Sequence, residues 1–125
     1  MGVRERHAVR TSGRADGQPM LFAHGFGCDQ HMWRLVAPYF EEQFLVVSFD
    51  YAGAGDAAAQ AYDPERHGTL AGYAADVLDI CRDLDLRDVV FVGHSVSAMI
   101  GALAAIEEPD RFASLIMVGP SPRYI

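Results

Sequence analysis

The most constraining feature of this chain is the stretch 89–100, which reads VVFVGHSVSAMI. Its unbroken run of apolar residues at 89–92 is typical of a strand buried on both faces of a parallel sheet. A Gly-x-Ser-x-Ser turn follows, and then an alanine-rich segment predicts a helix over 98–108. A tight turn between strand and helix would lift the hydroxyl of Ser95 clear of the sheet and place the next N–H beside it. The stretch therefore predicts a serine nucleophile.

The turn departs from the more usual Gly-x-Ser-x-Gly pattern at its last position, where Ser97 replaces a glycine. The flanking residues must be small because the bend brings strand and helix close together, and Gly93 meets that demand. Taken alone, the pattern could arise by coincidence in a turn rich in glycine and serine. The prediction therefore depends on the strand and helix around it.

The rest of the chain alternates segments with strand and helix patterns. Short apolar runs predict strands over 19–23, 44–50, 89–92 and 115–119, and weak alternation predicts an edge strand over 5–11. Helical spacing predicts helices over 32–42, which Pro38 should kink or shorten, and over 70–86, with Asp76 on the solvent side. This alternation predicts an α/β fold: a parallel sheet with helices on both faces.

Three of the predicted strands end in glycine-rich turns, at 24–27, 51–55 and 93–97. In a parallel sheet of this kind, ligands bind outside the carboxyl ends of the strands. We therefore expect the functional residues to gather at one rim of the sheet.

Composition narrows the class of protein and its partners. A length of 125 residues with 50% hydrophobic residues predicts a globular chain of at most one domain, which the resemblance given below makes a partial domain over 1–125. A net charge of −7 argues against a nucleic-acid partner. No apolar run reaches the ~18 residues of a membrane span, and the first residues lack a signal-peptide pattern. We expect a cytoplasmic chain with no membrane partner and no cofactor. Cys28 and Cys81 lie far apart in the sequence, which favours two free thiols over a disulfide or a metal site.

Five stretches resemble the α/β-hydrolase fold family: HGFGCDQ at 24–30, DYAGAG at 50–55, TLAGY at 69–73, GHSVSAMIG at 93–101 and GPSPRY at 119–124. More narrowly, they are similar to the RsbQ-type subgroup, which includes a bacterial stress-response regulator and the plant strigolactone and karrikin receptors. The plant receptors share the serine at the place of Ser97. The resemblance implies that Ser95 is the nucleophile and that the N–H groups of Phe26 and Val96 form an oxyanion hole, and the positions of these residues agree with that assignment.

The resemblance covers only the N-terminal half of the fold, before its cap and last strands. In this family the acid and the histidine follow the serine, whereas the thirty residues after Ser95 contain no histidine and a single aspartate, Asp110, which suits a turn better. Nothing then takes the serine proton, so we expect the chain alone to hydrolyse its substrates very weakly or not at all. We also expect a fragment, a truncated gene product or half of a split protein. Expressed alone, it should be insoluble or oligomeric, because 115–118 would form an exposed apolar edge.

The histidines near the turn have competing interpretations. Together with Gly25 and His94, His24 is expected in a pocket beside Ser95, although His24 could instead hydrogen-bond its own loop. A role for His94 as the base is disfavoured, because adjacent residues of a strand point to opposite faces. A metal held by His24 and His94 would lack further ligands, so no metal site is expected.

Two other functions compete with a hydrolase that acts on small hydrophobic esters or lactones. The run 53–58, GAGDAA, matches a dinucleotide-binding loop, but Pro64 interrupts the helix that such a loop needs and Asp56 would lie near the phosphates. The stronger rival is a signalling regulator that binds a small hydrophobic molecule in the same pocket and acts through a protein partner. The fold alone does not decide between hydrolase and regulator.

Overall fold

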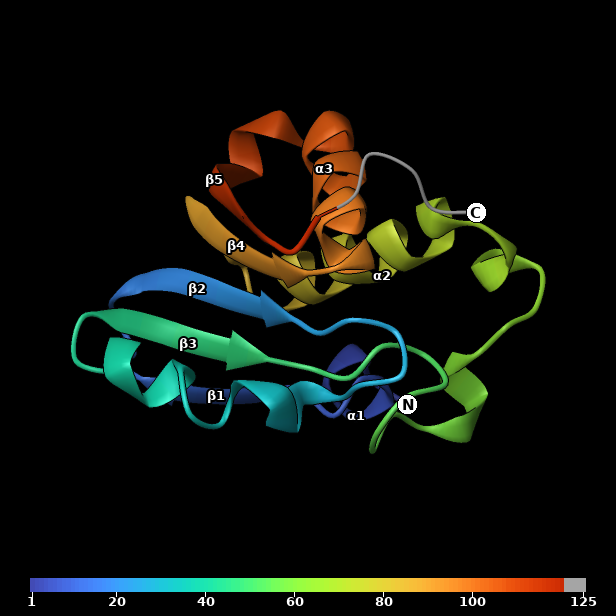
Figure 1. The fold of residues 1–125 in the computed structure, drawn as a ribbon, viewed down its shortest axis with the longest axis horizontal. Helices are drawn as coiled ribbons and strands as arrows, with labels where there is room; N and C mark the ends of the chain where they lie inside the picture. Colours follow the sequence, from blue (N-terminus) through green and yellow to red (C-terminus); the bar gives the residue numbers. More distant parts are fainter. Residues whose placement is uncertain (121–125) are drawn as a thin grey trace.

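In the computed structural model, residues 1–120 are described, and they form a five-stranded sheet with helices against it (Figure 1). The elements in chain order are α1 (Val3–Arg6), β1 (Arg10–Gly13), β2 (Gln18–Ala23), β3 (Phe44–Ser48), α2 (Leu70–Asp83), β4 (Val89–His94), α3 (Val96–Glu107) and β5 (Phe112–Val118). Short 3-10 helices lie between them: η1 (Gln30–Trp33), η2 (Ala37–Phe40), η3 (Ala59–Ala61), η4 (Arg66–Gly68) and η5 (Pro109–Arg111). Of the stretch GPSPRY at 119–124, residues 121–124 lie outside the described residues.

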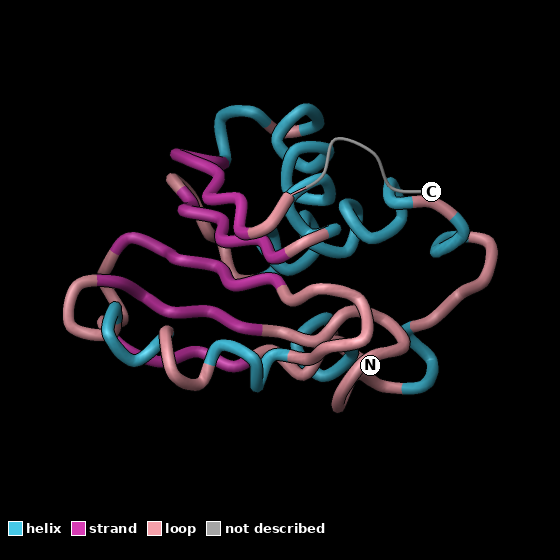
Figure 2. The backbone as a smooth tube through the Cα atoms, viewed as in Figure 1, coloured by secondary structure: helices cyan, strands magenta, loops and turns pink. Residues whose placement is uncertain are grey.

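The strand order is β1-β3-β2-β4-β5, and every neighbouring pair is parallel except β1 with β3. The predicted α/β class is therefore confirmed, with one antiparallel strand at the edge. Figure 2 shows the loops that follow β2 and β3 leaving the sheet on the same side. The parallel strands thus bring the glycine-rich turns to one rim.

The two faces of the sheet bury alternate residues of the same strands, as the two-residue repeat of a strand requires. Leu21, Val47 and Phe91 belong to the larger core, which α2 and α3 cover. Their neighbours in the strands, among them Phe22 and Val46, form a smaller core with Trp33 of η1. Phe40 of η2 packs against this smaller core. The second face is therefore covered by short 3-10 turns.

The helix predicted over 32–42 is wrong, because the chain forms η1 and η2 there with a break between them. Pro38 lies in η2, and proline lacks the N–H that a continuous helix would need at this position. Asp29 starts η1 by accepting a hydrogen bond from the N–H of His31 at 2.8 Å. A local cap and a proline thus outweigh the helical spacing of the apolar residues.

The edge strand predicted over 5–11 is shifted toward the C-terminus, since Val3–Arg6 is helical and β1 begins at Arg10. The N–H of His7 donates to the carbonyl of Val3 at 3.1 Å, and Ala8, with φ +47°, turns the chain into the strand. The helix predicted to reach Leu86 ends at Asp83, where Asp85 adopts φ +50° and the Leu86 N–H donates to the Cys81 carbonyl.

β5 forms the other edge of the sheet and is largely exposed. Ile116, Met117 and Val118 keep 46%, 44% and 41% of their surface exposed. Among residues 1–120, no strand pairs with the outer side of β5. None of the helices in this part of the chain is long and apolar enough to span a membrane.

Candidate active site

Ser95 occupies the turn between β4 and α3 with a strained backbone. Its φ of +57° and ψ of −122° lie in a region that residues other than glycine rarely adopt. The Ser95 N–H donates to the carbonyl of Val118 at 2.8 Å, and the Ser95 carbonyl accepts from the N–H of Ala98 at 3.0 Å. The ends of β5 and α3 therefore hold the serine in this conformation.

The strand and the helix approach each other closely at this turn. A Cβ atom added to Gly93 would lie 2.7 Å from the carbonyl oxygen of Ser97, a separation that backbone atoms do not tolerate. A larger residue at position 93 would therefore push the start of α3 away from β4. The close approach explains why this position needs a small residue.

The residues assigned to the oxyanion hole lie at the same cavity as Ser95. The cavity has a volume of about 520 Å³, and its described lining residues are Phe26, His67, Gly68, Thr69, Leu70, Tyr73, Ser95 and Val96. The N–H groups of Phe26 and Val96 take part in none of the hydrogen bonds of the turns and loops in residues 1–120. Within residues 1–120, both N–H groups are thus available to donate to a bound molecule.

Aromatic rings make up much of the cavity wall. The rings of Phe26 and Tyr73 lie 5.1 Å apart between centroids, and those of His67 and Tyr73 lie 4.8 Å apart. Half of the Phe26 surface, 52%, is exposed. The cavity therefore offers an apolar surface beside a serine hydroxyl.

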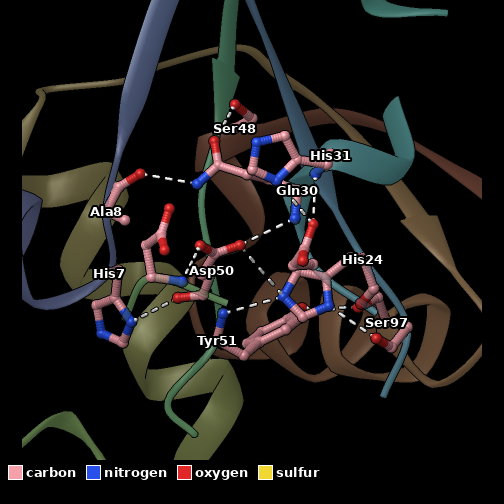
Figure 3. Close-up of polar contacts among 12 residues, drawn as sticks. His7, Ala8, His24, Gln30, His31, Ser48, Asp50, Tyr51 and Ser97 are labelled. Carbon is pink, nitrogen blue, oxygen red and sulfur yellow. Dashed lines mark hydrogen bonds and ion pairs between the residues drawn. The ribbon is translucent and has the colours of Figure 1, made fainter. Parts of the chain in front are cut away.

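His24 lies behind the cavity, and it is not one of the described residues that line it. Its side chain is fully buried, with Nδ1 hydrogen-bonded to the carbonyl of Gly25 at 2.7 Å and Nε2 accepting from the N–H of Tyr51 at 3.1 Å (Figure 3). Nδ1 therefore carries the proton of a neutral ring. Of the two interpretations of His24, the structure shows the loop hydrogen bond and places no part of the residue in the pocket wall.

Gly25 and His94 also lie beside the described cavity lining and not within it. A Cβ atom on Gly25 would come within 2.7 Å of Nδ1 of His94 and 3.4 Å of Cβ of Ser95, so loop and turn are in close contact. His94 makes no hydrogen bond to Ser95, and its Nδ1 is buried without a partner in residues 1–120. In residues 1–120, no three histidine, cysteine, aspartate or glutamate side chains lie so that they could hold a metal ion together.

The sequence interpretation missed a buried ion cluster behind the cavity wall. His67 donates from Nε2 to a carboxylate oxygen of Asp76 at 2.6 Å, and its Nδ1 accepts from the N–H of Asp63 at 3.0 Å. Arg66 donates to the other oxygen of Asp76 at 2.8 Å. Both ring nitrogens of His67 are occupied, so it fixes the wall and is not free to take a proton from Ser95.

The sequence predicts Asp76 on the solvent side of its helix, and this prediction is wrong, because only 2% of the residue is exposed. Its hydrogen-bond partners, Arg66 and His67, come from the segment before the helix, which folds back over α2. An acidic residue at a buried helical position, with an arginine and a histidine ten and nine residues earlier, is the signal that could have revealed the cluster.

A second buried carboxylate, Asp50, holds the turn that resembled a dinucleotide loop. Its two oxygens accept from the N–H groups of Gln30 at 2.9 Å and Asp56 at 2.8 Å (Figure 3). A Cβ atom on Gly55 would lie 2.5 Å from this carboxylate. Gly55 therefore makes room for a carboxylate of the protein itself, and this finding argues against a phosphate site.

An open α/β sheet with a strained serine turn at the end of its fourth strand defines a class of protein. The chain belongs to the alpha/beta hydrolase fold family, whose sequence profile matches residues 18–124. This result confirms the family that the sequence resembles.

Individual relatives narrow the comparison. The chain is 44% identical over 123 residues to karrikin insensitive 2 receptor CA of Petunia hybrida, covering 98% of this chain and 45% of that protein. It is 43% identical over 117 residues to strigolactone esterase D14 of Arabidopsis thaliana, covering 94% and 43%. A solved hydrolase from Oleispira antarctica superposes with a TM-score of 0.92 at 42% identity, over 96% of this chain and 44% of that one. The chain thus spans about half the length of these relatives.

Proposed function

We propose that Ser95 is the nucleophile of a serine hydrolase that acts on small hydrophobic esters or lactones. The observation that carries the proposal is the strained backbone of Ser95, in the wall of an apolar cavity that Phe26 and Val96 also line. In the reaction, the hydroxyl oxygen attacks the ester carbonyl carbon and the carbonyl electron pair moves to its oxygen. The N–H groups of Phe26 and Val96 would then stabilise the oxyanion.

The proton of the Ser95 hydroxyl needs an acceptor for this step. No histidine follows Ser95 in the sequence, and both nitrogens of the nearby His67 are occupied. In the family, the acid and the histidine come later in the chain than the serine. We therefore propose that the 125 residues alone are inactive or nearly so, and that the proton acceptor is supplied by a segment outside them.

The test joins residues 1–120 to the C-terminal part of the Oleispira antarctica hydrolase, a protein referred to below as the fusion. We expect the fusion to hydrolyse p-nitrophenyl butyrate, and the Ser95→Ala fusion to lose at least about 100-fold of that rate. The 125-residue chain should not exceed the buffer blank. A folded fusion whose activity survives Ser95→Ala, or a folded fusion without activity, would contradict the proposal.

A signalling role is the second candidate, because the petunia relative is named a receptor. In that role, the protein binds a small hydrophobic molecule in the same cavity and acts on a protein partner in the cytoplasm. Turnover of the fusion separates the two functions: fast Ser95-dependent hydrolysis supports a metabolic esterase. Slow turnover, together with a neighbouring gene for a PAS-type phosphatase, supports a regulator.

A further inference from the structure

Ser97, which replaces the usual glycine of the turn, makes two buried hydrogen bonds. Its side chain is fully buried on the first turn of α3. Its Oγ donates to the carbonyl of His24, because a carbonyl oxygen can only accept. The Tyr51 hydroxyl, 2.8 Å from the same Oγ, is then the donor of the second bond (Figure 3). A glycine here would leave two buried polar groups without a partner.

His24, whose carbonyl accepts the Ser97 hydrogen bond, determines the direction of the Phe26 N–H. The His24 ring, through Nδ1, and the Cys28 N–H, at 3.2 Å, both bond the carbonyl of Gly25. That carbonyl and the Phe26 N–H belong to one trans peptide group and point in opposite directions, since the group is planar. Holding the Gly25 carbonyl toward His24 therefore aims the Phe26 N–H away from it.

His24 is itself fixed at both its backbone and its ring. The Tyr51 N–H holds Nε2 of the ring, and the Ser97 hydroxyl holds the backbone carbonyl. Ser97 lies one residue after Val96, whose N–H is the other proposed donor to the oxyanion. The hydroxyl of Ser97 thus links the start of α3 to the residue that orients the loop after β2.

We propose that Ser97 is a positioning residue that sets the separation and direction of the Phe26 and Val96 N–H groups. This proposal rests on the proposed function of these two groups as the oxyanion hole. A pair of donors stabilises an oxyanion only when both meet it at hydrogen-bonding distance, and a misplacement of ~1 Å can cost about 100-fold in rate. Loss of the Ser97 hydroxyl should therefore affect the transition state more than substrate binding.

The first measurement is amide hydrogen exchange in the full 125-residue chain, which requires no catalysis. In Ser97→Ala we expect exchange in the segment 24–28 to rise roughly 10-fold, while peptides from α2 stay unchanged. Ser12→Ala, at an exposed serine of β1, is the matched control and should leave both regions unchanged. Unaltered exchange at 24–28 would overturn the proposal.

The second measurement uses p-nitrophenyl butyrate and the fusion. We expect Ser97→Ala to lower kcat by roughly 10-fold or more with KM within about twofold, the pattern of a group that acts only in the transition state. A merely structural role would lower the melting temperature and leave kcat at lower temperature intact, and that outcome would overturn the proposal. If the unaltered fusion is folded but inactive, the proposed function fails, and the exchange measurement alone decides the role of Ser97.

Tyr51→Phe keeps the proposal testable if Ser97→Ala does not fold. This variant removes the hydroxyl that donates to Ser97 but leaves the bond from Ser97 to the His24 carbonyl. We expect a smaller rise in exchange at 24–28, about 2–4-fold, because the Ser97 hydroxyl then becomes freer to rotate. No change at 24–28 in this variant would overturn the proposal.

Discussion

At the residue scale, the buried His7 makes the stability of the folded chain depend on pH. Its Nδ1 is hydrogen-bonded to the carbonyl of Asp50 at 3.1 Å, and its Nε2 lies 3.9 Å from a carboxylate oxygen of Asp76. Burial lowers the pKa of His7 below its usual value of 6.5, although Asp76 raises it in part. A buried ring with one unpartnered nitrogen therefore resists protonation.

This lowered pKa of His7 predicts a loss of stability in mild acid. The unfolded chain binds the proton more readily than the folded chain, so the free energy of unfolding should fall as the pH drops below about 6.5. Urea unfolding between pH 7.5 and 5.5 measures this slope. His7→Asn retains a donor for the Asp50 carbonyl but does not titrate, so its slope should be shallower. Equal slopes in the two proteins would rule out His7 as the source.

At the scale of elements, Asp76 of α2 binds the segment before that helix through hydrogen bonds from Arg66 and His67. We expect Asp76→Asn to lower the free energy of unfolding by roughly 2–3 kcal/mol, because His67 and Arg66 lose a buried charged partner. Asp79→Asn is the matched control, since Asp79 pairs with the same Arg66 at 3.1 Å but is partly exposed. Its cost should stay below about 1 kcal/mol. Equal urea midpoints for the two variants would contradict this account.

The elements also show which parts of the fold were predictable. The runs in β2, β3 and β4 are apolar without interruption, so a local pattern was enough to find these buried strands. The helical spacing over 32–42 gave a wrong prediction. The spacing indicates which residues are buried, but it does not show whether a helical backbone can continue past Pro38. The role of His24 depends on Tyr51 and Ser97, two partners distant in the sequence that no local pattern contains.

At the scale of the whole molecule, the free edge at β5 predicts self-association. Ile116, Met117 and Val118 expose apolar surface on a strand that is unpaired on one side in the described part of the chain. We expect sedimentation velocity to show oligomers of the 125-residue chain, and Ile116→Lys to shift the distribution toward monomer. A sharp monomeric boundary with cooperative melting for the unaltered chain would contradict this expectation.

The family could be identified from the sequence because three of the five similar stretches lie where β2, β3 and β4 end, and each of these stretches is a local pattern. The strained turn at Ser95 also follows from local sequence, since a buried strand, two small residues and a helix start leave few alternatives. The hydrogen bonds of Ser97 could not be predicted, because its partners, His24 and Tyr51, come from two other turns. Its substitution for glycine was visible, but the hydrogen bonds were not.

We propose above that Ser95 attacks the substrate while the N–H groups of Phe26 and Val96 stabilise the oxyanion. The most direct measurement is a crystal structure of the fusion after reaction with an alkyl fluorophosphonate, in which the serine oxygen bonds phosphorus and fluoride leaves. The account predicts phosphorus on Ser95 and a phosphonyl oxygen about 2.7–3.1 Å from both amide nitrogens. Phosphorus on another residue, or an oxygen that faces solvent away from Phe26 and Val96, would contradict it.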